Sequence, residues 1–203
     1  MSSAKAAIGL DFGTESVRAL VVDLEGCELG EATDAYAHGQ ITESLPGTGE
    51  KLPPDFALQH PTDWIDSAVK AVQGAMKAAG IKGEQVVGLG VDFTRCTMLP
   101  AVADGTPLCL VDKFAAEKFA WPKLWKHHGA KTQTDRINEL AKERKESFLS
   151  RYGGVIGLEW FFPKMLETLE EAEHIYDATD VWLEAGDWFV WQLVGSDASE
   201  LPR

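Results

Sequence analysis

The sequence is short of positive charge and of cysteine, and it has no long apolar run. Its 19 lysines and arginines stand against 32 aspartates and glutamates, so the formal net charge is -13. This charge repels the phosphates of nucleic acids and anionic lipid surfaces, and we expect neither as a partner. No run approaches the ~20 apolar residues of a membrane span, and no apolar signal segment precedes the first predicted strand. A cytoplasmic protein is the simplest expectation.

The cysteines and several missing motifs exclude further classes. Cys27, Cys96 and Cys109 are odd in number and widely separated, which fits neither a disulfide framework nor a CxxC metal site, so we expect reduced thiols. The nucleophile motif Gly-x-Ser-x-Gly and internal repeats are also absent. With 203 residues, 45% of them hydrophobic, the chain can bury a core as one domain.

The sequence does contain a polar turn between two apolar β-like runs near its start. Ile8 and Leu10 alternate along the first run, and Val17, Ala19 and Val21 along the second. The glycine turn therefore joins strand to strand, whereas glycines in GxxxxGK[ST] and GxGxxG motifs lead into a helix, and neither motif is present. A hairpin of this kind is suited to holding nucleotide phosphates.

The side chains of this turn supply the chemistry that phosphates need. Gly13 has no Cβ to block a phosphate, and the amides of Gly13, Thr14 and Glu15 can form an anion-binding concavity. Thr14 and Ser16 add hydroxyl donors. Asp11 offers a carboxylate suited to holding Mg²⁺ through water, and Arg18 is a forked cation able to reach a γ-phosphate. The alternative is an ordinary tight hairpin with solvated polar residues.

The rest of the first half continues as an α/β pattern. A third antiparallel strand is expected near residues 27–37, and the Gly- and Pro-rich stretch 38–60 is expected to be a surface excursion. A helix should start near Trp64, capped by Thr62 or Asp63, and continue to Gly80. The next segment, Val86–Phe93, is apolar on both faces, which predicts a buried central strand.

The second half is predicted to be mainly helical. First, Asp104-Gly105 is a strong turn signal between 97–102 and 107–110, so a hairpin is expected there. Two amphipathic helices should follow, one with an apolar stripe from Ile137 to Phe148 and one around Met165. The Trp-rich segment 181–193 suits a buried helix, although a short strand at its start is an alternative.

Several later blocks, in this order, resemble the FGGY family of sugar kinases and, within it, the ribulokinases. They are Val91–Pro100, Asp104–Leu108, Leu124–His128, Asp135–Leu140 and Tyr152–Lys164. The resemblance implies an α/β fold of the ribonuclease-H-like, actin-like ATPase type, with antiparallel β-hairpins plus parallel strands flanked by helices. It also implies that residues 1–203 form an incomplete N-terminal FGGY domain, with the C-terminal FGGY domain absent.

The activity that the resemblance implies is phosphorylation of L-ribulose to L-ribulose 5-phosphate in L-arabinose catabolism. ATP and Mg²⁺ would be the cofactors, and a homo-oligomer is a possible assembly. In the family, the aspartate that acts as catalytic base lies beyond the position of Arg203, so the chain alone is expected to have little or no kinase activity.

The resemblance also implies a sugar side of the cleft. Four candidate residues follow the end of the apolar strand, where α/β sheets tend to bind ligands: Asp92, Thr94, Arg95 and Cys96. Three more match family stretches near the substrate: Trp125, Glu159 and Trp160. Thr94 and Arg95 could bind sugar hydroxyls, and Trp125 could form an apolar platform. For Trp125, core packing is the alternative, and for Glu159 and Trp160 it is a buried helix start.

Arg95 departs from the ribulokinase pattern, which has a small residue there, whereas glycerol kinases have an arginine. A kinase for another sugar or polyol therefore stays open, as do a non-catalytic sugar- or nucleotide-binding remnant and an actin-like ATPase without a sugar substrate. Adjacent His127 and His128 cannot chelate one ion together on a helix, which favours a helix-end role. The acidic run from Glu167 to Glu173 is expected to be a solvated helix face.

Overall fold

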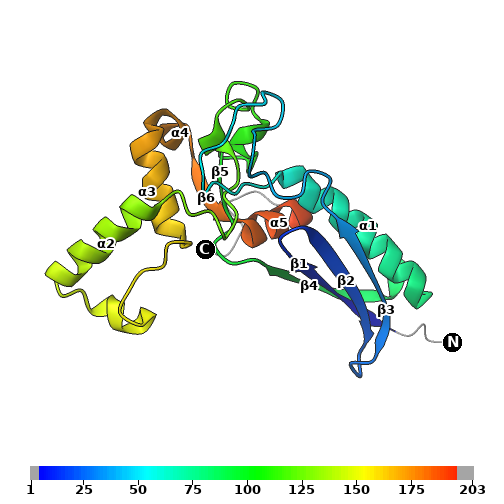
Figure 1. Ribbon diagram of the computed structural model, residues 1–203. Helices are drawn as coiled ribbons and strands as arrows, with labels where there is room; N and C mark the ends of the chain where they lie inside the picture. The colour runs from blue at the N-terminus through cyan, green and yellow to red at the C-terminus, as the bar shows by residue number, and fades with distance from the viewer. Residues whose placement is uncertain (1–4, 196–203) are drawn as a thin grey trace. The chain divides into compact units, whose positions relative to one another are not determined.

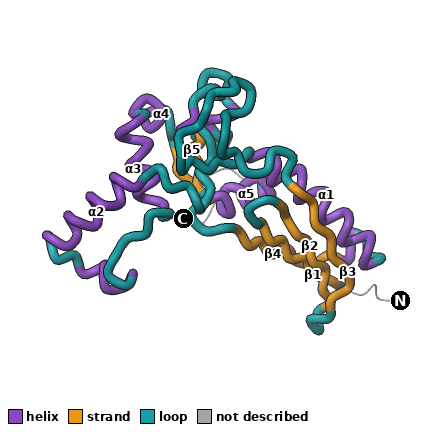
Figure 2. Tube along the Cα trace, in the orientation of Figure 1, coloured by secondary structure: helices purple, strands orange, loops and turns teal. Residues whose placement is uncertain are grey.

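The computed structural model describes residues 5–195, which form two compact units (Figures 1 and 2). Unit 1 comprises the residues up to 40 together with 60–94 and 186–195, and unit 2 comprises 41–59 and 95–185. The expectations about a signal segment and about a catalytic base past Arg203 lie outside the described residues. Between residues 5 and 195, no helix is both long enough and apolar enough to cross a bilayer.

Unit 1 is built on a four-stranded mixed sheet. Its strands are β1 (Ala6–Phe12), β2 (Ser16–Asp23), β3 (Glu28–Ala35) and β4 (Val86–Phe93), in the order β3-β2-β1-β4. β1, β2 and β3 pair antiparallel, and β4 runs parallel to β1. The opening hairpin and the third strand are confirmed, because alternation of apolar side chains is a local signal that sets both strand and register.

The helix α1 (Pro61–Ala79) covers the β3 and β2 side of this sheet. Its N-cap is His60 rather than the predicted Thr62 or Asp63, because Pro61 takes the first helical position, where its missing N–H costs nothing. Gly80 ends the helix with φ 68°, as predicted. The contact with β3 is close: a Cβ on Gly30 would lie 2.5 Å from the Ala79 nitrogen, so only glycine fits there.

Aromatic side chains fill the other end of the same sheet face. Phe12 stacks on Phe93 with ring centroids 4.4 Å apart, and Phe189 of α5 (Ala185–Val194) lies 4.5 Å from Phe12. Trp188 of α5 meets Trp64 of α1 edge to face. The Trp-rich segment therefore contributes a helix to the core of unit 1, as its composition predicts.

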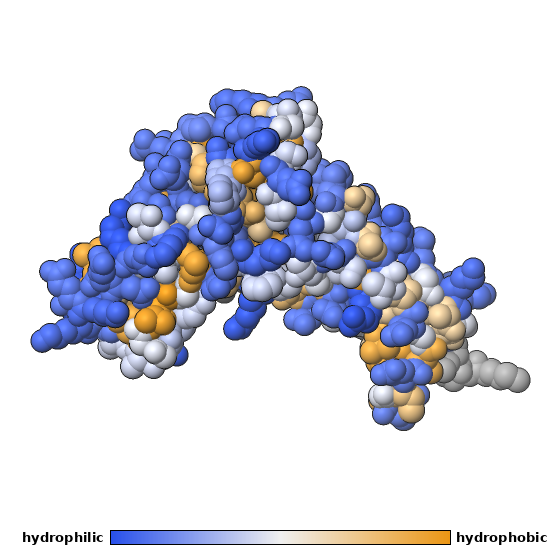
Figure 3. All heavy atoms as spheres, in the orientation of Figure 1, coloured by the Kyte–Doolittle hydropathy of each residue, from blue (hydrophilic) through white to orange (hydrophobic). Residues whose placement is uncertain are grey.

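The prediction that Val86–Phe93 is a buried central strand is wrong. β4 lies at an edge of the sheet as the described residues form it, and Val87 and Leu89 are 54% and 44% exposed. α1 packs against β3 and β2 and does not cover β4, so the apolar character of β4 is not matched by burial. Figure 3 shows apolar surface at the end of the sheet where β1 begins.

Unit 2 contains a second, two-stranded sheet and most of the helices. Its β5 (Met98–Ala101) pairs antiparallel with β6 (Val181–Glu184), far away in sequence. The helices are α2 (Lys131–Glu143), α3 (Phe161–Glu171) and α4 (Glu173–Asp177). Short 3-10 helices occur in both units, at Gly83–Gln85, Leu108–Leu110, Lys118–Ala120 and Ser147–Tyr152.

The hairpin expected around Asp104-Gly105 is only half correct. The turn forms, with Gly105 at φ 85° and the Asp104 carboxylate accepting from the Thr106 amide at 2.9 Å. The return segment makes one antiparallel bridge, from Pro107 to Ala101, and then becomes the 3-10 helix Leu108–Leu110, whereas the regular pairing of β5 is with β6. Turn chemistry is local, whereas the choice of strand partner depends on residues some 80 positions away.

The expectation of a surface excursion at 38–60 is corrected by burial. Leu45 and Leu58 are 1% and 0% exposed. Together with other apolar side chains of this segment they form the core of unit 2 with partners that include Leu108, Trp121 and Ile175. Isolated bridges, Ile41 to Leu58 and Ser44 to Lys51, replace regular pairing, so the buried positions follow neither a helical nor a strand period.

The open edge at β4 yields a prediction about self-association. An apolar edge strand offers unpaired backbone groups and apolar side chains to another chain, and lysines on such an edge oppose pairing. The double variant Val87→Lys, Leu89→Lys should therefore weaken self-association about tenfold, as measured by sedimentation velocity. Leu24→Lys, at a 62% exposed turn position, is the control. Equal association of the two variants would contradict the prediction.

Candidate functional site

The turn between β1 and β2 is held by backbone hydrogen bonds and by one buried tyrosine. The Gly13 amide donates to the Ser16 carbonyl at 2.9 Å, which closes the turn. Just after β3, the Tyr36 hydroxyl donates to the Gly13 carbonyl at 3.2 Å, and the Tyr36 amide donates to the Glu15 carbonyl at 2.9 Å. Burial, with Asp11 and Asp63 nearby, raises the pKa of Tyr36, so its hydroxyl remains a donor. The turn is thus fixed before any ligand arrives.

Gly13 is not demanded by the fold of this turn. Its φ lies outside the left-handed region, and a Cβ there would meet the Ser16 carbonyl oxygen at 3.4 Å, an ordinary contact. The backbone would therefore accept alanine with little strain. The absence of a side chain at Gly13 leaves the surface beside Thr14 and Glu15 open, which is what close approach of a phosphate requires.

Charged side chains lie beside the turn. Asp11 and Arg18 face each other across β1 and β2, and the Arg18 guanidinium contacts the Asp11 carboxylate at 3.2 Å. Asp92 is opposite Asp11 on the parallel strand β4, and it is also exposed. Asp11 is 54% exposed and offers hard oxygen ligands at the surface, so it fits a hydrated Mg²⁺.

The other predicted side chains of the hairpin have defined places. Ser16 is the first residue of β2, and Glu15 is exposed and hydrogen-bonded to Gln40. Thr14 is half-buried within the turn. All five predicted phosphate-binding residues and Asp11 therefore belong to one short segment of unit 1.

The residues predicted to face a sugar are divided between the units. Asp92 and Thr94 end the β4 segment of unit 1, and Arg95 and Cys96 begin unit 2 as a turn. Arg95 is exposed, and Cys96 has φ 59°, which is unusual for a residue other than glycine. Burial, followed by the charge of Glu184, raises the pKa of the Cys96 thiol, so it is no nucleophile at neutral pH.

Within unit 2, the remaining predicted residues surround the start of α3. Trp125 is 39% exposed, and its amide donates to the Thr97 hydroxyl at 3.2 Å. Trp160 is the N-cap residue of α3, and its ring packs on Tyr152 with centroids 4.8 Å apart. Glu159 contacts His128 at 3.2 Å. The structure therefore brings Cys96 into the same unit as Trp125, Glu159 and Trp160.

A buried polar cluster in unit 2 was missed by the sequence prediction. The Lys123 ammonium contacts the Glu167 carboxylate at 2.6 Å and also donates to the Lys164 carbonyl and the Thr168 hydroxyl. His127 contacts Glu167 at 2.9 Å from the other side. The helix-end role for His127 is therefore wrong, and so is the solvated face for Glu167, which is 2% exposed.

The ionisation of this cluster follows from its burial. Burial raises the pKa of Glu167, but the hydrogen bond from His127 and the charge of Lys123 outweigh it, so the net pKa is lowered. Burial lowers the pKa of His127 to about 4, so the imidazole is neutral at pH 7. Lys123 also has a lowered pKa because of burial, opposed by Glu167. Glu167 thus carries the negative charge that Lys123 needs.

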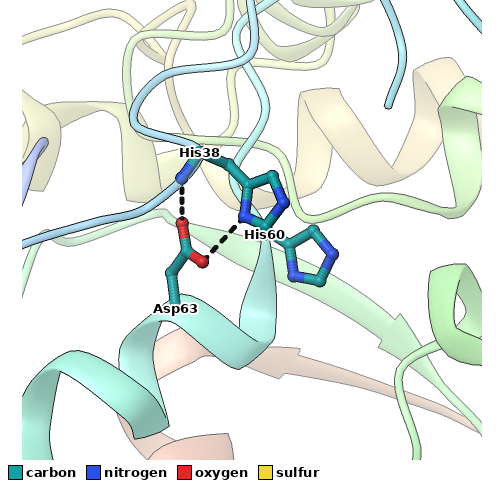
Figure 4. A group of neighbouring side chains, drawn as sticks. All are labelled: His38, His60 and Asp63. Atoms are coloured by element: carbon teal, nitrogen blue, oxygen red, sulfur yellow. Dashed lines mark hydrogen bonds and ion pairs between the residues drawn. The ribbon is translucent and has the colours of Figure 1, made fainter. Parts of the chain in front are cut away.

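A second cluster, His38, His60 and Asp63, has ligand types typical of a metal site (Figure 4). Its geometry, however, serves the start of α1. The Asp63 carboxylate accepts from the His38 amide at 2.9 Å and contacts the His38 Nδ1 at 2.8 Å. The two imidazoles are stacked at 4.2 Å with planes 13° apart, so their in-plane lone pairs run side by side rather than converge. The cluster ties residue 38 to the first turn of α1.

Known structures share this fold. A xylulose kinase from Rhodospirillum rubrum aligns with 92% of this chain and 33% of its own, with TM-score 0.67 and 18% identity. A gluconate kinase from Lactobacillus acidophilus aligns with 94% of this chain and 33% of its own, with TM-score 0.66 and 15% identity. At such identities the likeness defines the fold alone, and it confirms a mixed α/β fold of the actin-like ATPase class.

Sequence comparison defines the family. The N-terminal domain model of the FGGY family of carbohydrate kinases matches residues 6–202, and the chain belongs to that family. The chain is 54% identical over 193 residues to a ribulokinase from Mycolicibacterium smegmatis and 48% identical over 191 residues to one from Geobacillus thermodenitrificans. Each match covers 94% of this chain and 34% of the relative, so the chain spans about a third of their length.

The openness at Gly13 can be tested by adding one methyl group. Gly13→Ala should leave the free energy of unfolding within about 0.5 kcal/mol, because the Cβ fits. It should weaken MgATP binding by about tenfold, followed by NMR titration, because the methyl group occupies phosphate space. Gly9→Ala, on β1 just before the turn and with nothing near its Cβ, is the control. Unchanged MgATP affinity in Gly13→Ala would show that phosphates do not approach this turn.

His127 should make the fold sensitive to acid. Its pKa is about 4 in the folded state against an ordinary value of 6.5, so its contribution to stability is complete above pH 6.5 and is lost as the pH falls towards 4. The gap corresponds to roughly 3 kcal/mol. In urea unfolding series between pH 7 and 4, His127→Gln should flatten the decline, whereas the exposed-site variant His174→Gln should keep it. Parallel curves for His127→Gln and the unchanged protein would disprove this role.

Proposed function

We propose that the chain supplies the phosphate-binding hairpin and part of the sugar site of an ATP-dependent ribulokinase. The observation that carries this proposal is the identity of 54% and 48% to curated ribulokinases over 94% of the chain. The reaction is transfer of the γ-phosphate of ATP to the terminal hydroxyl of L-ribulose. The preformed turn at Gly13 and the exposed Asp11 and Arg18 are consistent with it.

In this proposal the hairpin binds and orients the triphosphate. Phosphoryl transfer depends mainly on positioning and on neutralising charge. The Gly13 carbonyl is held by Tyr36, so the backbone amides of Thr14 and Glu15 stay in place while the hydroxyls of Thr14 and Ser16 add donors. Mg²⁺, when bound, neutralises charge on the phosphates, and Asp11 is the residue that would hold it. The Arg18 guanidinium contacts Asp11 through one nitrogen and has further N–H groups that could donate to a phosphate oxygen.

In unit 2, the turn at Arg95 and Cys96 and the segment before α3 would contribute to the sugar side. Thr94 and Arg95 provide a hydroxyl and a guanidinium for sugar hydroxyls, with Asp92 and Cys96 next to them in sequence. The 39% exposed ring of Trp125 is accessible as an apolar platform, with Glu159 and Trp160 in the same unit. The family resemblance implies that the aspartate that accepts the hydroxyl proton lies outside these 203 residues.

Arg95 favours a second candidate, a kinase for another sugar or polyol. Its exposed side chain can reach a ligand and donate forked hydrogen bonds to neighbouring hydroxyls. The same fold carries kinases for different substrates, and substrate choice lies in side chains such as this one.

The proposal is tested by binding and turnover with the purified chain. L-Ribulose should bind in titration calorimetry more tightly than glycerol. A coupled assay should detect little or no ADP, because the family resemblance implies that the catalytic aspartate lies outside these 203 residues. Arg95→Ala should weaken binding of whichever of the two ligands binds more tightly by about tenfold, through loss of the Arg95 hydrogen bonds.

Arg144→Ala, at an exposed position of unit 2 just after α2, is the matched control. Tighter binding of glycerol than of L-ribulose would favour the polyol alternative, and kinase turnover at an ordinary rate would overturn the predicted inactivity.

A further inference from the structure

Lys164, on the first turns of α3, is buried and points its ammonium at three backbone carbonyls. Its Nζ donates to the carbonyl of Cys96 at 2.7 Å, of Leu124 at 2.9 Å and of Trp125 at 3.2 Å. The side chain is 0% exposed. An ammonium has three N–H donors and no acceptor, so these three carbonyls use its full capacity. One side chain therefore joins α3 to two other segments.

The two segments are the ones that carry predicted sugar-facing residues. The two segments already pair at one point, because the backbones of Met98 and Lys123 exchange hydrogen bonds of 3.0 and 2.8 Å. Beyond that pair, towards Arg95 on one segment and Trp125 on the other, regular strand pairing does not continue. In this unpaired part, Lys164 joins the two segments by donating to the carbonyls of Cys96 and Trp125.

The conformation of Cys96 shows that its turn needs such a restraint. A residue other than glycine at φ 59° is strained by about 1 kcal/mol or more, and strained residues persist only where their surroundings fix them. Cys96 is fixed from α3, because its carbonyl accepts from the Lys164 ammonium at 2.7 Å. The start of α3 therefore sets where Arg95 is presented.

We propose that Lys164 is a positioning residue for the sugar site, which holds the Arg95–Cys96 turn and the Trp125 segment in a fixed relation to α3. This rests on the proposed function, in that the segments it fixes are taken to bind the sugar. Lys164 itself does not touch the sugar, because its donors are used by protein carbonyls. Its loss should loosen the sugar side and leave the phosphate-binding hairpin, which belongs to unit 1, unaffected.

The test uses the 203-residue chain and Lys164→Met, which keeps the length of the side chain and removes all three donors. L-Ribulose affinity in titration calorimetry should fall about tenfold, whereas MgATP affinity should stay within about twofold. Native-state amide exchange by NMR should accelerate at Met98 and Trp125 more than elsewhere in unit 2. A merely structural role would change both ligand affinities together and would raise exchange across the unit.

Two controls separate positioning from stability. Ile175→Val removes one methylene from the buried core of unit 2 and lowers stability away from these segments. Lys142→Met removes an exposed ammonium. If Lys164→Met does not fold, Thr97→Val, which removes the hydroxyl that accepts from the Trp125 amide, provides the same comparison, read at the Met98 amide.

The outcomes are distinct. Selective acceleration at these amides together with selective loss of sugar affinity supports the proposal. Acceleration no more selective than in Ile175→Val, or sugar affinity unchanged in Lys164→Met, overturns it. If the unchanged chain does not bind L-ribulose at all, the proposed function fails, and amide exchange alone then decides whether Lys164 fixes these segments.

Discussion

Two ammonium groups buried in unit 2 constrain how its segments meet. Within residues 5–195, Glu167 supplies the one buried carboxylate that contacts either ammonium, and it pairs with Lys123; an unpaired buried charge costs several kcal/mol. Lys164 is instead surrounded by three backbone carbonyl oxygens. Burial lowers the pKa of Lys164 to about 7, an effect opposed by the charges of Cys96, Glu184 and Glu159. Segments 96–98, 123–127 and 164–168 must therefore keep one arrangement.

The features that the sequence predicts correctly are those that short stretches decide. The β1–β2 hairpin follows from alternation over a dozen residues, and α1 follows from its apolar period and from Gly80, which takes the left-handed conformation that ends it. The prediction fails where distant residues decide. The regular partner of β5 is β6, far away in sequence, and β4 is largely exposed because α1 packs mainly against β3 and β2. Apolar composition alone cannot tell an edge strand from a central one.

The candidate site shows the same division. The hairpin that we propose to bind phosphates could be predicted as a structure because its residues are contiguous, from Asp11 to Arg18. The support of the segments that we propose to bind the sugar could not, because Lys123 meets Lys164 and Glu167 across more than 40 positions. Glu167 stands in an acidic run that resembles a solvated face. A local signal did exist for Lys164: it is the one charged residue between Phe161 and Leu166, where the free energy of burying it requires partners.

Glycines separate the requirements of the fold from those of a ligand. A Cβ on Gly30 would meet the Ala79 backbone at 2.5 Å, and one on Gly129 would collide with the Glu167 carboxylate, so packing alone explains both. Gly13 differs from these two, because its φ and its surroundings would accept a side chain, as those of Gly9 would. What distinguishes Gly13 from Gly9 is its place on a turn fixed by Tyr36 and flanked by Asp11 and Arg18. In the proposed function a phosphate approaches this turn from outside, and the missing side chain leaves room for it.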